Sequence, residues 1–157
     1  MRQAIGTTWV MQLVIIFMLI FVAFLALTIN YTKAFKIKNE LVTILEKYEG
    51  VSESENGSLS LINNYLQYNG YLTKGKCDET QYGVSDLNSS TIEEVEKNEK
   101  YYYCIEKINT GTVSVPNRAK YNIRIFFHFS LPVLGDLFTF KVEGTTIDIT
   151  HANPNDL

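Results

Sequence analysis

The chain begins with a long apolar block, and apolar and polar positions mix only after it. Between Trp9 and Ile29 no side chain is charged, and the one strongly polar residue is Gln12. As an α-helix this run would span about 30 Å, the thickness of the hydrocarbon core of a bilayer. We therefore predict a transmembrane helix over residues 9–30, preceded by a short N-terminal leader or tail over residues 1–8.

Two other interpretations of the apolar block fit less well. A cleaved signal peptide has an apolar region of roughly 7–15 residues followed by small residues at the cleavage site. Here the block is longer, and its small residues lie inside it. The core helix of a soluble protein seldom stays apolar on every face over such a length. We expect an uncleaved anchor, with Trp9 and Tyr31 at the two membrane interfaces.

An amphipathic helix is predicted to continue the anchor over residues 31–49. Neither Pro nor Gly interrupts this stretch, and Gly50 follows it as the expected left-handed cap. Apolar residues recur at alternating spacings of three and four, which predicts a seam that packs on another surface. The seam positions are Ala34, Ile37, Leu41, Ile44 and Tyr48, and Phe35, Val42 and Leu45 widen the seam.

Residues 50–157 are predicted to form one extracytoplasmic domain. A short helix is expected over residues 59–72, with Ser58 as its cap and Asn69-Gly70 near its end. The following segment, residues 74–98, is polar and acidic, and a solvated surface is the interpretation that this composition favours.

From residue 100 the apolar positions alternate with a period of two, which predicts β-strands. We expect strands over residues 101–109, 118–130 and 138–150, an extension of the first strand at 113–115, and a turn over 131–137. The predicted fold class is α+β: a long N-terminal transmembrane and amphipathic helix packed on a small C-terminal antiparallel β-sheet, most simply a meander.

The charge distribution narrows the range of partners. The chain has 14 Lys and Arg against 17 Asp and Glu, and every acidic residue follows residue 39. No basic stripe of the kind that binds nucleic acid is present in the sequence. We expect membrane lipid as a partner and no nucleic acid.

Cys77 and Cys104 are the two cysteines of the chain. Both lie in polar or aromatic surroundings, as suits a single disulfide in an oxidising compartment. Such a bridge would contribute roughly 3–4 kcal/mol in the chain-entropy model. Two unpaired buried thiols are the alternative.

The orientation of the anchor rests on two opposing signals. Four lysines, at positions 33, 36, 38 and 47, follow the apolar block, whereas Arg2 precedes it, and this count favours a cytoplasmic C-terminal side. The rule weakens where a whole folded domain follows, and the cysteine pair favours an oxidising side. We expect a single-pass cell membrane protein with a cytoplasmic N-terminus.

The sequence offers no catalytic arrangement. His128 alternates within a predicted strand, and His151 lies in the polar tail. No Ser/His/Asp or Cys/His set, metal-spaced ligand set or Gly-rich phosphate loop can be assembled. The acidic residues Glu93, Glu94, Glu96 and Glu99 lack the fixed oxygen offsets and turn glycine of a Ca²⁺ loop. We expect no enzymatic activity, no cofactor and no small-molecule substrate.

Two stretches carry a resemblance to a known family. They are the amino end, MRQAIGTTWVMQLVIIFMLIFVAFLAL, and the carboxyl hairpin, YNIRIFFHFSLPVLGDLFTFKVEGTTI, together about a third of the chain. A short polar leader with Gly6 directly before the hydrophobic helix, then a strand, a Pro-containing turn and a returning strand, resembles the TadE-like minor pseudopilins of bacterial tight-adherence pilus systems. The resemblance implies a pilin-like fold and leader processing at Gly6. Apart from the resemblance, small residues such as Gly6 favour close approach of helices in lipid, and Gln12 would seek a partner on a neighbouring helix, so we expect a helix contact at both residues.

The resemblance also has a departure. The glutamate that prepilins carry five residues after the cleavage glycine corresponds to Met11 here, and the nearest polar residue is Gln12. This difference favours a membrane-held accessory subunit over a major pilin. We expect a subunit of a pilus or secretion filament that acts by packing with other pilin-like subunits or assembly-platform proteins. The alternative is a monomeric single-pass protein whose outer domain binds a ligand or partner.

Overall fold

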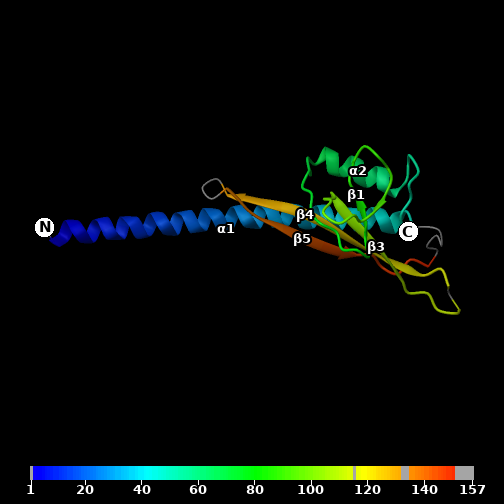
Figure 1. Cartoon of the computed structure of the whole chain (residues 1–157). Helices are drawn as coiled ribbons and strands as arrows, with labels where there is room; N and C mark the ends of the chain where they lie inside the picture. The colour runs from blue at the N-terminus through cyan, green and yellow to red at the C-terminus, as the bar shows by residue number, and fades with distance from the viewer. Residues whose placement is uncertain (1, 115, 132–134, 151–157) are drawn as a thin grey trace.

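A computed structural model shows one long helix joined to a small α+β head (Figure 1). The structure describes residues 2–114, 116–131 and 135–150, with side chains for residues 8–114, 116–128 and 139–150. The elements are α1 (Arg2–Lys47), α2 (Ser58–Tyr68), β1 (Tyr82–Val84), β2 (Glu93–Glu94), β3 (Tyr103–Asn109), β4 (Ala119–Leu131) and β5 (Gly135–Thr145). The expected fold class, a long N-terminal helix with a small antiparallel sheet, is confirmed.

Helix α1 runs without a break through the expected leader, anchor and amphipathic segment. It ends in a Schellman motif, in which the N–H of Gly50 donates to the carbonyl of Leu45 over 2.9 Å and the N–H of Glu49 donates to Glu46. The left-handed position of this motif is Glu49, with φ of 54°, while Gly50 has φ of 131°. The expected cap is therefore one residue off: Gly50 follows the left-handed residue.

The five strands form one antiparallel sheet in the order β2-β1-β3-β4-β5. Strands β3, β4 and β5 make the expected meander, with Ile105 opposite Ile123 and Ile125 opposite Val142. Strands β1 and β2 extend the sheet on the other side of β3. The β4–β5 hairpin is the longest part of the sheet and lies along α1, reaching back towards its N-terminal half (Figure 1).

The core lies between one face of the sheet and the two helices. Every second residue of β3 and β4 faces it, and the facing residues of α1 and α2 close it from above. Packing of this kind hides an apolar stripe of each helix and one face of the sheet from water. The aliphatic residues with 0% exposure are Leu41, Leu45, Leu59, Ile62, Leu66, Val84, Ile105, Ile123 and Ile125.

The opposite face of the sheet is also partly covered. Arg124 and Phe126 point to that face and are nevertheless buried, at 6% and 4% exposure. The chain around Gly75 lies directly over Phe126, so closely that a Cβ at position 75 would collide with the aromatic ring. The acidic segment therefore does more than form a solvated surface, because its first residues cover this face.

Several local expectations differ from the structure. Helix α2 ends at Tyr68, and its N-cap is Gly57, since the Ser58 hydroxyl accepts a hydrogen bond from the Ser52 N–H instead of capping the helix. The expected end signal does hold: Gly70 adopts φ of 62° in a Schellman motif that ties the Tyr71 N–H to Leu66.

The observed strand boundaries also differ from the predicted ones. Residues 113 and 114 lie in a turn and do not extend the first strand. Strand β5 ends at Thr145, although Ile149 still forms an isolated bridge with Ala119. Part of the expected turn, residues 132–134, and the tail with His151 lie outside the described residues.

Candidate functional site

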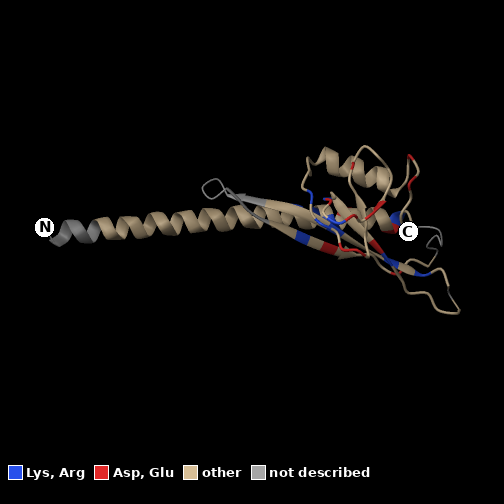
Figure 2. Ribbon diagram, viewed as in Figure 1, with Lys and Arg blue, Asp and Glu red and all other residues tan. Residues whose placement is uncertain are grey.

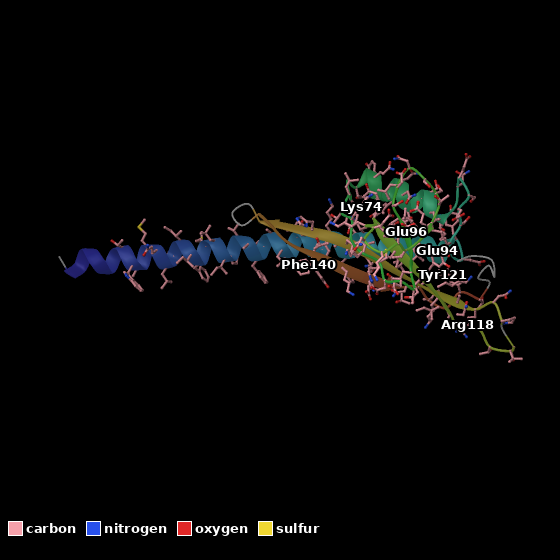
Figure 3. All side chains as sticks on the ribbon, viewed as in Figure 1. Lys74, Glu94, Glu96, Arg118, Tyr121 and Phe140 are labelled. Carbon is pink, nitrogen blue, oxygen red and sulfur yellow. A yellow bond between two sulfur atoms is a disulfide. The ribbon has the colours of Figure 1, made fainter. Side chains whose placement is uncertain are left out.

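The first candidate site is the part of α1 before Asn30, which we call the bare half. One helix among the described residues, from Thr8 to Lys47, is long and apolar enough to cross a membrane. Its large apolar side chains between Trp9 and Ile29 are 43–73% exposed, which is the exposure of a helix with no neighbours. In Figure 3 these side chains project on all sides of the ribbon. No charged residue interrupts this region (Figure 2).

The two residues expected at a helix contact lie at the far end of this bare half. Gly6 is part of the continuous helical backbone of α1. Gln12 is exposed and shares a shallow, mostly apolar groove on the helix surface with Thr8, Met11 and Ile15. The amide of Gln12 and the hydroxyl of Thr8 are thus one turn apart on the same face.

The expected seam continues in the covered half of α1, with a shift in its later positions. Ile37 and Leu41 are 2% and 0% exposed and belong to the core. Ile44 is only partly buried, and Tyr48 is exposed, whereas Leu45 is fully buried in their place. The seam thus follows residues 34, 37, 41 and 45, a spacing of 3-4-4 that matches a straight helix of 3.6 residues per turn.

The expected cysteine pair is bonded. Cys77 and Cys104 form a disulfide with their Cα atoms 5.7 Å apart and 27 positions apart in sequence. Cys104 lies on β3 opposite Arg124 of β4, on the face of the sheet away from the helices. The bridge therefore holds the chain before β1 onto that outer face.

Charged groups reinforce the same attachment. The buried Arg124 guanidinium lies 2.7 Å from the Asp78 carboxylate and donates from Nε to Glu143 over 2.8 Å. The hydrogen bond from Arg124, together with its positive charge, lowers the pKa of Asp78 below its ordinary value. Because Asp78 follows Cys77 directly, the disulfide and the ion pair anchor one segment at two neighbouring points.

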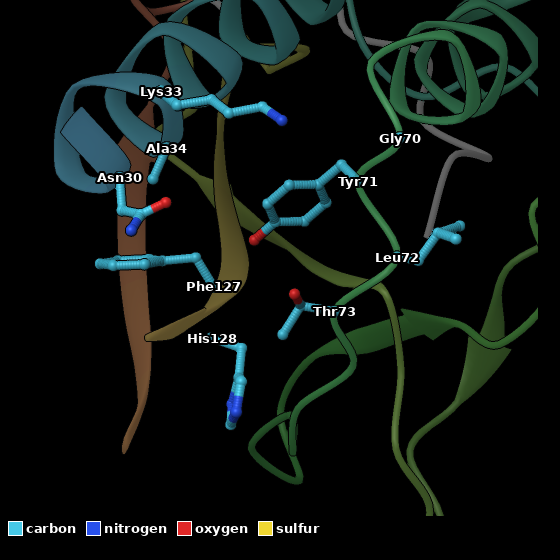
Figure 4. A pocket seen from close by; sticks show the side chains of 9 residues that line it. All are labelled: Asn30, Lys33, Ala34, Gly70, Tyr71, Leu72, Thr73, Phe127 and His128. Atoms are coloured by element: carbon cyan, nitrogen blue, oxygen red, sulfur yellow. The ribbon is translucent and has the colours of Figure 1, made fainter. Parts of the chain in front are cut away.

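A pocket lies beside α1 at residues 30–34, where the bare half ends and the head begins to cover the helix. We call it the junction pocket. Figure 4 shows the Tyr71 ring between the α1 turn that carries Lys33 and the strand that carries Phe127. The volume of the pocket is about 130 Å³. Its lining comes from α1, the segment after α2, and β4: Asn30, Lys33, Ala34, Gly70, Tyr71, Leu72, Thr73, Phe127 and His128.

Sequence reasoning missed this pocket. Lys33 entered only the count of positive charges, and Tyr71 was placed near the end of a helix. The signal available was a polar and basic turn directly after the apolar block, at Asn30 and Lys33. Nothing in the sequence indicates that the chain after α2 passes over that turn.

Tyr103 and His128, two further side chains that could carry chemistry, serve the fold or face water. Tyr103 is fully buried, and its hydroxyl donates to the side-chain oxygen of Asn63 over 2.9 Å; burial raises the pKa of this phenol. His128 is exposed, with Nδ1 3.4 Å from the Thr139 hydroxyl. Within the described ranges, no group of three or more His, Cys, Asp or Glu side chains could hold a metal ion.

Comparison with known proteins assigns no relative to this chain. No family model, no curated protein and no solved structure matches it. The function must therefore be argued from the anchor, the head and the junction between them.

Proposed function

We propose that this protein is a membrane-anchored, pilin-like subunit of a pilus or secretion filament, with its N-terminus in the cytoplasm and its head outside. It acts by packing against other pilin-like subunits or assembly-platform proteins, without catalysis. The bare half of α1 holds it in the bilayer and supplies the contact with those partners.

The observation that carries the proposal is the division of α1 into a bare and a covered half. Among the residues whose side chains the structure describes, the head buries α1 positions after Asn30, whereas the large apolar side chains from Trp9 to Ile29 stay exposed. In lipid, small residues allow close approach of helices and polar side chains form bonds between them. Gly6, Thr8 and Gln12 place both kinds of residue at one end of the bare half.

The disulfide supports the outward orientation of the head. Disulfides form and persist in oxidising compartments and are rare in the cytoplasm. The bond between Cys77 and Cys104 lies in the head, and this supports a head on the oxidising side with the N-terminus of α1 on the other.

Cross-linking within the membrane tests the proposal. Single cysteines are introduced at positions 6 to 16 in the full chain, which has no free cysteine of its own. They are expressed with pilus or secretion components of one host, and disulfide or bismaleimide cross-links are mapped. We expect cross-links to recur with helical periodicity and to include the face of Gly6 and Gln12.

Gly6→Leu is the informative variant, because it adds bulk at the expected helix crossing without touching the head. We expect it to abolish the cross-links while the melting temperature of the head stays unchanged, and Leu19→Ile, on the bare half away from Gly6, serves as the control. A protein that remains monomeric and without cross-links beside those components would instead be a single-pass protein whose head binds a ligand or partner.

A further inference from the structure

The junction pocket lies at a defined depth relative to the membrane. The apolar run ends at Ile29, and the α1 residues that line the pocket, Asn30 to Ala34, follow at once. At 1.5 Å per residue these positions rise to about 7 Å beyond the end of the run. The polar headgroup layer of a bilayer is about 5–7 Å thick on each side of its hydrocarbon core. If α1 spans the bilayer, the pocket therefore opens among the headgroups.

The charge of the pocket favours an anion. Lys33 is part of the lining, and no Asp or Glu belongs to it among the described residues. Along α1 three lysines, at positions 33, 36 and 38, come before the first acidic residue, Glu40. The acidic residues that are coloured in Figure 2 lie on the head, away from the bare half of the helix. Lys33 therefore gives the described lining of the pocket a positive charge.

The buried hydroxyl of Tyr71 also indicates that the pocket binds a ligand. Its side chain is 6% exposed, and its hydroxyl has no hydrogen-bond partner among the described residues. A buried hydroxyl without a partner is unfavourable, and a phenylalanine would fill the same space without that cost. In Figure 4 the hydroxyl points away from the Tyr71 backbone into the space between Asn30, Phe127 and Thr73. It is a donor directed into the pocket that lacks an acceptor.

We propose that the junction pocket binds the phosphate of one anionic phospholipid from the membrane that holds α1, with Lys33 as the cation and the Tyr71 hydroxyl as a hydrogen-bond donor. The depth of the pocket distinguishes a headgroup from dissolved phosphate as the source of this group. The Tyr71 hydroxyl is buried at the inner end of the pocket, and the long side chain of Lys33, on the exposed surface of α1, can turn to the phosphate. This site requires only that α1 spans the bilayer, and it does not depend on a filament.

Native mass spectrometry of the full chain released from detergent micelles tests the site. The protein is titrated with phosphatidylglycerol or with phosphatidylcholine, whose cationic choline Lys33 repels, and the retained lipid is counted. The variants are Lys33→Gln and Tyr71→Phe. Lys36→Gln is the matched control, because it removes the same charge one turn farther along α1 and its side chain does not line the pocket.

We expect the wild type and Lys36→Gln to retain one phosphatidylglycerol in preference to phosphatidylcholine. Lys33→Gln and Tyr71→Phe should each lower the affinity about tenfold, the effect of losing one charge-assisted hydrogen bond. Tyr71→Phe should do so without lowering the melting temperature, which separates the ligand role from a structural one. Equal losses in Lys33→Gln and Lys36→Gln, full retention in Tyr71→Phe, or displacement of the lipid by excess inorganic phosphate would each overturn the proposal.

Discussion

The two halves of α1 are built from similar apolar residues but have different surroundings. Before Asn30 the helix is apolar on every face, and every large side chain from Trp9 to Ile29 is exposed. After Asn30 a stripe of four residues is buried at 0–2% exposure, while the other faces carry charged and polar residues together with a few exposed aromatic rings such as Phe35. The buried residues of that stripe are Ala34, Ile37, Leu41 and Leu45.

The difference shows how one uninterrupted helix can serve two solvents. An all-round apolar surface suits lipid, where no face needs to be hidden. A single apolar stripe suits water, where only one face can be covered by the sheet. No kink or glycine marks the transition within α1 between residues 8 and 47; only the charge pattern changes, at Lys33.

Placing a charge in the stripe should have the largest effect. In Leu41→Asp a fully buried leucine becomes a carboxylate within the core, and we expect the head to lose more than about 3 kcal/mol of stability. Asn39→Asp, on the exposed side of the same turn, should change the stability by less than about 0.5 kcal/mol. Thermal unfolding of both variants measures the difference. An unchanged melting temperature for Leu41→Asp would place this stripe elsewhere than in the core.

Breaking the disulfide should affect the head and leave the bare half intact. Cys77→Ser with Cys104→Ser frees the segment before β1, and the chain-entropy model gives a loss of about 3–4 kcal/mol for a loop of this size. Denaturant unfolding, followed in parallel by far-UV circular dichroism, should show a less stable head with the helicity of the anchor retained. Equal stability with and without the bond would mean that other contacts already fix this segment.

The close approach of α1 to β5 offers a smaller perturbation. A Cβ on Gly144 would lie 2.9 Å from Cγ2 of Val42 and 2.5 Å from Cδ of Lys38. Lys38 can move, but Val42 is branched and stiff, so Gly144→Ala should cost about 1–2 kcal/mol. Thr145→Ala, at the exposed neighbouring position, is the control. Identical melting temperatures of the two variants would show that the helix lies farther from β5.

The helix ends provide a gain of stability. Both helices end in a Schellman motif, with Gly70 at the left-handed position in α2 and Glu49 in α1. A non-glycine residue in this conformation costs about 1 kcal/mol. Glu49→Gly should therefore stabilise the head by up to about 1 kcal/mol, and Gly70→Glu should destabilise it. A loss of stability in Glu49→Gly would contradict this assignment.

The smallest effect is expected with pH. The pKa of Asp78 is lowered by Arg124, so the contribution of this pair is complete above the ordinary aspartate pKa of about 4. It is lost as the pH falls through the lowered value in the folded state. The melting temperature of Asp78→Asn should thus fall less than that of the wild type on going below pH 4. If the melting temperatures of the two proteins fell in parallel below pH 4, the Asp78–Arg124 ion pair would not contribute to the stability of the head.

The sequence predicted the parts of the fold that carry periodic patterns. The apolar run, strands β3 to β5 and the cysteine pair were all visible. The phase of the stripe was missed at Ile44 and Tyr48, because alternating spacings of three and four average 3.5 residues per turn. Such a pattern suits supercoiled helices, whereas a straight helix on a sheet brings Leu45 inward.

Other parts depend on contacts that no local pattern records. Strands β1 and β2 are three and two residues long, and their pairing with each other and with β3 defines them. Gly83, Glu93 and Glu94, three of their five residues, have low β-propensity. Ser58 is a residue type that commonly caps helices, but its hydroxyl oxygen accepts a hydrogen bond from the Ser52 N–H and so is not available to α2. The junction pocket likewise needs three segments that are distant in sequence.

The boundary between the two halves of α1 can be measured directly by a cysteine scan in native membranes. Single cysteines from position 9 to 47 are exposed to a water-soluble maleimide, and the labelling rates are compared. We expect protection throughout 9–29, rapid labelling at exposed positions such as 36 and 39, and protection again at 37 and 41. Rapid labelling across 13–25 would contradict the account, because it would place the bare half of α1 in water.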